Sequence, residues 1–197
     1  MPQTEASEAK STKDERVLAA ARELFDRYGY KRTTMVDIAT QAGMSRQTLY
    51  SSYPNKEAIL RAAMIEMART TAAEIEAGLE SATDLGAQLR LVLEKTVLEP
   101  FVRIYSQPDA TDLLEGAAAA GADVMEESKA RYRAFTEGIL EPHAARIAEL
   151  GMTPERLART LAASAAGLKA QAADADELRQ ALDDLVRLQV AALDVDR

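Results

Sequence analysis

The stretch Ala42–Ile59, AGMSRQTLYSSYPNKEAI, decides the fold of this chain. Gly43 is a residue type that ends helices, and Ser45 is one that begins them. Pro54 stops the second helix only a few residues later. A helix this short is marginal on its own. Either its neighbours hold it as part of the core, or it is there to be inserted into a binding partner.

The bulk composition indicates a globular protein. The chain has 197 residues, of which 47% are hydrophobic and 28% are charged. It has no cysteine, which excludes disulfides and thiolate metal sites. Its first twelve residues are polar, unlike a signal peptide, and no apolar run reaches the roughly 18 residues of a membrane span. We therefore expect a cytoplasmic protein that needs no cofactor.

Charge is distributed unevenly along the chain. The net charge is −8, yet residues 1–63 hold ten of the 24 basic residues against eight acidic ones. Such asymmetry is a weak indication of a basic contact surface on the N-terminal third.

The pattern of apolar residues predicts an all-α fold of about nine helices. Strand-like alternation is missing, and apolar residues recur at helical spacing, as in Val17, Ala21, Leu24 and Tyr28. A first helix should end at Gly29. The others are expected near 34–42, 45–51, 55–78, 83–98, 109–119, 122–150, 153–172 and 174–193. Pro100 should close the fifth of these nine helices, and Pro142 should kink the seventh.

Capping residues mark several helix starts. Thr34 with Asp37 makes a capping box, and Ser45 and Asn55 are expected N-caps. Thr153 should cap a helix that has Pro154 at its first position. The helix from Asn55 is long enough to link two domains.

The helices at 34–42 and 45–51, joined by a turn at Gly43, form a helix-turn-helix pattern. Leu49 should point inward, which turns a polar set outward. These outward residues are Arg46, Gln47, Thr48, Tyr50 and Ser51. Such a set packs poorly but suits DNA, because Arg and Gln can bond base edges and hydroxyl groups can bond phosphates.

The segment TTMVDIATQAGMSRQTLYSSYPNKEAIL resembles the DNA-binding motif of the TetR/AcrR family of bacterial transcriptional regulators. The resemblance covers about residues 14–61. It implies a helix-turn-helix DNA-binding domain at 13–58 and a helical effector-binding and dimerisation domain at 59–197. Residues 1–12 are expected to form a disordered tail, as chain ends often do. By the same resemblance, Thr34, Tyr50 and Lys56 match positions that grip phosphates. Residues Arg46, Gln47 and Thr48 match positions that face bases or nearby phosphates.

Other readings of these residues remain open. Thr34 and Ser45 are helix caps whether or not they also contact DNA. Two positions depart from the family pattern: Gln47 stands where the family often has a small residue, and Ser52 stands where it often has histidine. Gln47 is therefore long enough to contact a base that other family members do not contact.

The family's remaining helices typically form a dimer and a small-molecule pocket. We expect homodimerisation through apolar stripes on the last two helices, each of which could instead cover the core of its own chain. The interface residues would be Leu157, Leu161, Ala165, Leu168, Leu182 and Leu185. The effector candidates are Phe101, Tyr105, Met125, Tyr132, Phe135 and His143. These effector candidates could equally be ordinary core or surface residues.

The predicted function is a ligand-responsive regulator, most simply a repressor released from a palindromic operator by a small apolar or cationic effector. The alternative is a helical protein-interaction or small-molecule-binding module without DNA release by ligand. An enzyme is not expected, because with one histidine and no cysteine a nucleophile–base pair would need Ser or Lys chemistry, and no motif for it appears. No glycine loop or metal-ligand cluster is evident either.

Overall fold

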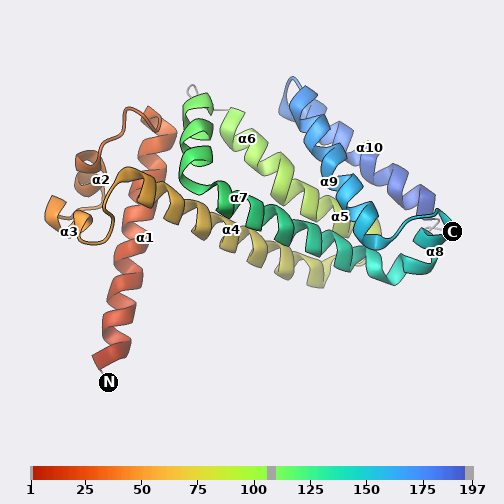
Figure 1. Ribbon diagram of the computed structural model, residues 1–197, viewed down its shortest axis with the longest axis horizontal. Coiled ribbons are helices and arrows are strands. Elements are labelled where there is room, and N and C mark those ends of the chain that lie inside the picture. Colours follow the sequence, from red (N-terminus) through yellow and green to blue (C-terminus); the bar gives the residue numbers. More distant parts are fainter. Residues whose placement is uncertain (1, 106–109, 194–197) are drawn as a thin grey trace. The chain divides into compact units, whose positions relative to one another are not determined.

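The protein is described by a computed structural model that places the backbone of residues 2–105 and 110–193, and the side chains of 12–104 and 111–193 (Figure 1). Throughout these ranges the regular structure is helical, as the sequence predicts. The helices are α1 (Pro2–Tyr28), α2 (Met35–Gln41), α3 (Arg46–Tyr50), α4 (Lys56–Ser81), α5 (Leu85–Leu93), α6 (Glu99–Tyr105), α7 (Ala110–Leu140), α8 (Ala144–Glu149), α9 (Pro154–Gln171) and α10 (Ala175–Leu193). None of the described helices is both long and apolar enough to cross a membrane.

The chain forms two compact units. The first comprises Met1–Ala68 and Tyr105–Met125, and the second comprises Arg69–Ile104 and Glu126–Arg197. This division differs from the predicted boundary at residue 58, because the first part of α7 joins the N-terminal helices. Both α4 and α7 contribute residues to each unit.

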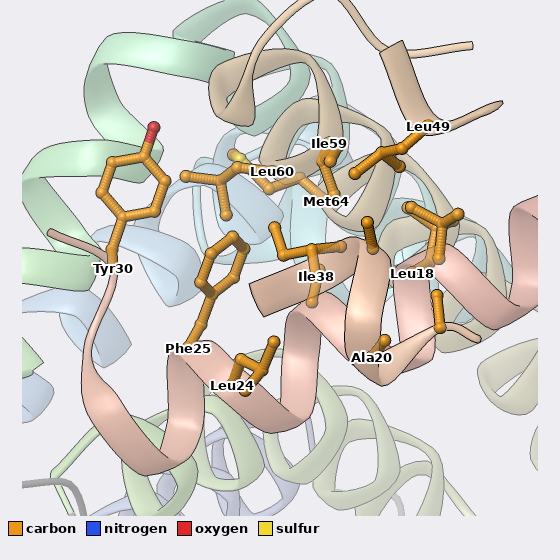
Figure 2. Packing of buried hydrophobic residues seen from close by; sticks show 14 of the residues in the cluster. Leu18, Ala20, Leu24, Phe25, Tyr30, Ile38, Leu49, Ile59, Leu60 and Met64 are labelled. Atoms are coloured by element: carbon orange, nitrogen blue, oxygen red, sulfur yellow. The ribbon is translucent and has the colours of Figure 1, made fainter. Parts of the chain in front are cut away.

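The first unit has one apolar core built from α1, α2, α3, α4 and α7. Figure 2 shows Leu18, Phe25, Ile38, Leu49 and Ile59 converging in it, and all five are buried. One expectation for α1 is wrong. The side chain of Tyr28 is 45% exposed, and the buried aromatic is Tyr30, whose ring meets that of Phe25 edge-on at 5.3 Å. The helix has ended by then, so the loop sets the direction of Tyr30.

The expected caps are confirmed. Thr34 and Asp37 form a reciprocal capping box on α2, and Ser45 accepts from the backbone N–H of Thr48 at the start of α3. Asn55 caps α4, since its Oδ1 accepts from the N–H of Ala58 at 2.8 Å. Glycines 29, 43 and 151 all have positive φ, as expected of helix-ending residues.

The start of α1 corrects the prediction of a disordered tail. The helix begins at Pro2 and includes residues 2–12. This segment contains glutamate, alanine and lysine, which favour helices, and its proline occupies the first helical position, where no N–H is needed. Polarity alone was therefore a poor guide to its backbone.

The second unit packs α5 against α10, and α10 against α9. Its apolar residues form two clusters. The larger one contains Ile75, Leu89, Leu140, Ile147 and Val186, and the smaller one centres on Phe101 and Leu178.

Prolines act differently in the second unit than the sequence suggests. Pro100 was expected to end a helix at 98, but the chain passes through a π-helical turn at Glu94–Leu98 and continues as α6. In this wider turn, the N–H of Glu99, just before the proline, donates to the carbonyl of Glu94, five residues earlier. Pro142 does interrupt its helix, in a 3-10 turn at Glu141–His143.

The two helices expected at 109–119 and 122–150 meet at a kink. Gly121 has φ −152° and ψ 36°, which is not helical, and α7 continues on both sides of it. A Cβ at this residue would lie 2.7 Å from the terminal methyl carbon of Met64. A side chain at this position would require the end of the Met64 side chain to move.

Candidate nucleic-acid interface

The short helix α3 is held against α2 by its buried side. Leu49 is fully buried, and the turn between the helices passes through Gly43 at φ +63°, a conformation that disfavours residues with a side chain. The N–H of Met44 donates to the carbonyl of Ala39 at 3.0 Å and closes the turn. The packing rather than the length of α3 therefore stabilises it.

The outward side of α3 carries the polar residues that the sequence predicts there. Arg46, Gln47, Thr48 and Ser51 are exposed, and the side chain of Tyr50 is 51% exposed. Their exposure is confirmed, while their contacts with DNA remain a prediction. The Oγ of Ser45 bonds Thr48 at its backbone N–H and its hydroxyl, so both residues also order the start of α3.

Thr34 is exposed at the start of α2, and its contact with a phosphate stays a prediction. Its hydroxyl and N–H donate to Asp37 at 2.7 and 2.9 Å. The hydroxyl hydrogen bond, followed by the backbone one, holds the pKa of Asp37 below its usual value. The carboxylate thus stays ionised and fixes the rotamer of Thr34.

Lys56 is already bonded within the chain. Its Nζ donates to the carbonyls of Tyr30 at 2.6 Å and Thr33 at 2.8 Å, with that of Lys31 at 3.4 Å. The ammonium also lies 4.3 Å from the centroid of the Tyr30 ring. Burial lowers the pKa of Lys56, against opposing contributions from acidic neighbours. These contacts explain a lysine at the start of α4 without a phosphate, and the phosphate contact stays a prediction.

The loop at 29–33 is also bonded to α7. The backbone N–H of Lys31 donates to Asp112 at 2.6 Å, and its Nζ pairs with Asp112 and Glu115. Asp123, further along α7, accepts two hydrogen bonds from the guanidinium of Arg61 on α4. These bonds lower the pKa of the Asp123 carboxyl to about 2. Sequence reasoning did not find these pairs, because nothing local connects residues so far apart in the chain.

The residues predicted for the dimer interface belong to the core of their own chain. Leu157, Leu161, Ala165 and Leu182 are each at most 5% exposed in the single chain. Leu168 and Leu185 are half-buried against the apolar clusters of the second unit. In the single chain these stripes cover their own core, and the dimer interface stays a prediction.

The predicted effector residues are divided between the two units and their apolar clusters. Phe101 is buried in the smaller apolar cluster, while Tyr132 and Phe135 pack half-buried against the larger one. Met125 belongs to the first unit. His143 is half-buried in the 3-10 turn, and the side chain of Tyr105 lies outside the described residues. Burial raises the pKa of Tyr132, so its hydroxyl stays neutral.

The first unit thus has the geometry of a helix-turn-helix DNA-binding domain, with a short helix presenting polar side chains beside a buried leucine. Comparison with known proteins identifies the family that this DNA-binding domain resembles. Residues 17–63 match the family model of bacterial regulatory proteins, tetR family. Residues 17–63 therefore carry a DNA-binding domain of the tetR type.

A curated relative matches part of the chain, and two solved structures match its fold. The A-factor receptor protein of Streptomyces griseus is 36% identical over 78 residues, which cover 39% of this chain and 28% of that protein. A TetR transcription regulator from Haloarcula marismortui has a TM-score of 0.71 at 22% identity, covering 92% of this chain and 98% of that one. A regulator from Saccharomonospora viridis, solved in complex with choline, has a TM-score of 0.65 at 20% identity, with 92% and 96% covered. The two structures show the same fold.

Proposed function

We propose that the protein is a cytoplasmic, homodimeric repressor that binds a near-palindromic operator and leaves it when a small apolar or cationic effector binds. The observation that carries the proposal is the exposed polar side of α3. Four side chains able to bond bases or phosphates stand on a helix whose opposite side is anchored by the fully buried Leu49.

The role proposed for each of these residues follows from its position in the helix-turn-helix. Arg46 and Gln47 lie in the first turn of α3, where a recognition helix reaches base edges. Thr34, Ser45, Thr48 and Tyr50 carry hydroxyl groups that can donate to the phosphates on either side, and Thr34 would do so by exchanging its bond to Asp37 for one to a phosphate. We assign Lys56 to holding the loop at 29–33, in view of its three carbonyl partners.

Selection of bound duplexes from a random pool tests the proposal. We expect two inverted half-sites about one helical turn apart, because one recognition helix of each protomer enters successive major grooves. Recovery of no consensus would overturn DNA recognition and favour the alternative, a helical interaction or ligand-binding module.

Base reading by α3 is tested residue by residue. Arg46→Ala and Gln47→Ala should each cost on the order of 1–3 kcal/mol on the selected site and relax preference at one or two positions. Repeating the selection with each variant measures this directly. Thr40→Ala is a suitable control, because Thr40 is exposed on α2 and its hydroxyl bonds the carbonyl of Val36 within the helix. An unchanged consensus for both variants would show that neither residue reads bases.

Dimerisation should use the free faces of α9 and α10. Helical spacing places a set of exposed small residues on one side of α9: Ala162, Ala163, Ala166, Gly167 and Ala170. On α10 the exposed apolar residues are Leu188, Ala191 and Ala192. Small side chains let helices of two protomers approach closely in a four-helix interface.

The effector should bind in the second unit. Tyr132 and Phe135 are the best-supported contacts, since both are half-buried on α7 beside the larger apolar cluster. The neutral hydroxyl of Tyr132 and the aromatic rings suit an apolar or cationic compound. Because α4 and α7 contribute to both units, they provide a path from such a site to the DNA-binding unit.

Reciprocity of binding tests the release mechanism. Choline, which the Saccharomonospora viridis regulator binds, is the first small cation to titrate by calorimetry, followed by a panel of apolar and cationic metabolites. A true effector should bind roughly 5–150-fold more weakly when the protein is saturated with operator, since linkage makes the effect mutual. Tyr132→Phe and Phe135→Ala should weaken binding of the same compound. Equal affinity with and without operator would rule out this release.

A further inference from the structure

The turn of α1 at residues 13–16 lies against the helix-turn-helix. Three side chains of this turn, Lys13, Asp14 and Arg16, bond α2, α3 or the residues that follow them. We call these three residues the α1 clamp. They come from a part of the chain that is neither in the helix-turn-helix nor among the expected DNA contacts.

Lys13 bonds the end of α3. Its Nζ donates to the carbonyl of Thr48 at 3.1 Å and to the Oγ of Ser52 at 2.8 Å. The last carbonyls of a helix have no partner within the helix, and a cation there is also favoured by the helix dipole. Ser52 therefore has a structural role within the domain, because its hydroxyl accepts a hydrogen bond from Lys13.

Arg16 and Asp14 bond the neighbouring turns. The guanidinium of Arg16 donates to the carbonyls of Ala42 at 2.5 Å and Gly43 at 3.1 Å, where α2 ends. Asp14 accepts from the hydroxyl of Tyr53 at 3.1 Å, just after α3. The clamp therefore holds both ends of the segment that carries the recognition helix.

We propose that Lys13 and Arg16 are positioning residues for DNA recognition: they set the orientation of α3 from α1 without themselves touching DNA. The proposal rests on the proposed function of α3. With five residues, α3 depends on its surroundings for a defined orientation. The nitrogen donors of the clamp face carbonyl groups of the domain, and a side chain so placed acts on the DNA through α3.

Hydrogen exchange of the DNA-free protein tests the clamp directly. In Lys13→Met, the amides of Leu49, Ser51 and Ser52 should exchange roughly tenfold faster, the change expected for losing one charge-assisted hydrogen bond. Lys13→Arg should restore slow exchange, because a guanidinium can donate to the same two oxygens. Arg22→Met is the matched control: it removes the same charge from an exposed position of α1.

DNA binding separates positioning from direct contact. Lys13→Met should lower the ratio of operator to non-specific affinity by roughly tenfold, while the slope of log K against log salt should match that of Arg22→Met. A fall in slope of roughly 0.9 beyond the control would indicate a lost phosphate contact and overturn the proposal. So would a lower melting temperature with an unchanged affinity ratio, since that reports only fold stability.

The exchange measurement keeps this proposal separate from the proposed function. If selection recovers no operator, the function of α3 as a reading helix fails. Unchanged amide exchange in Lys13→Met, or exchange in Lys13→Arg as fast as in Lys13→Met, would instead overturn the clamp itself, whatever the DNA experiments show.

Discussion

The double variant Ala166→Glu with Leu188→Glu is expected to be a folded monomer that has lost roughly 10²–10⁴-fold in operator affinity. The loss arises because a dimer places two recognition helices on one duplex, and the second contact benefits from the high effective concentration created by the first. Two glutamates in a two-fold symmetric interface face like charges and lose water.

Because both sites are exposed in the single chain, this test separates loss of dimerisation from loss of folding. Ala166 is exposed and Leu188 is 67% exposed in the single chain, so glutamate at either site is compatible with the fold. Changing Leu161 and Leu182 instead would place charges in the apolar core, since they are 2% and 5% exposed, and the chain would unfold before reporting on assembly.

Sedimentation or light scattering at micromolar concentration measures the oligomeric state, and circular dichroism checks that the fold survives. The control is Ala130→Glu with Leu150→Glu, which introduces the same two changes at exposed positions on α7 and just after α8. Dimers that persist in the test variant would show that the interface lies elsewhere.

Replacing Lys56 with methionine should lower the free energy of unfolding by about 2 kcal/mol, the order expected for a charge-assisted hydrogen bond. The variant removes the donor shared by the carbonyls of Tyr30, Lys31 and Thr33. These carbonyls belong to the loop that leads into Thr34, the cap of α2. We therefore expect weaker DNA binding on all sequences with an unchanged salt slope.

The salt slope decides between the two roles of Lys56. A phosphate contact would lower the slope by roughly 0.9 in the variant, and the family resemblance implies that result. Lys129→Met serves as the control for loss of one charge, because Lys129 is an exposed residue of α7 in the second unit. A reduced slope with unchanged stability would contradict the loop-holding role.

Local chemistry in the sequence determined much of the DNA-binding unit. The capping box at Thr34, the cap at Ser45, the turn at Gly43 and the inward direction of Leu49 all depend on residues within a few positions of each other. Helix caps and 3.6-residue periodicity are short-range, so one sequence is enough to find them. The outward polar set of α3 follows from the same periodicity.

The tertiary structure decided what periodicity leaves ambiguous. An apolar stripe such as that of Leu157 and Leu161 looks alike whether it covers the core of its own chain or a partner, and only packing showed that these leucines are internal. Likewise, the sequence places Lys56 at a helix start but not beside the carbonyls of residues 30–33, and it places Lys13 in a polar segment but not at the end of α3. Such contacts join residues more than 20 positions apart, and their formation depends on how whole helices pack rather than on any local pattern.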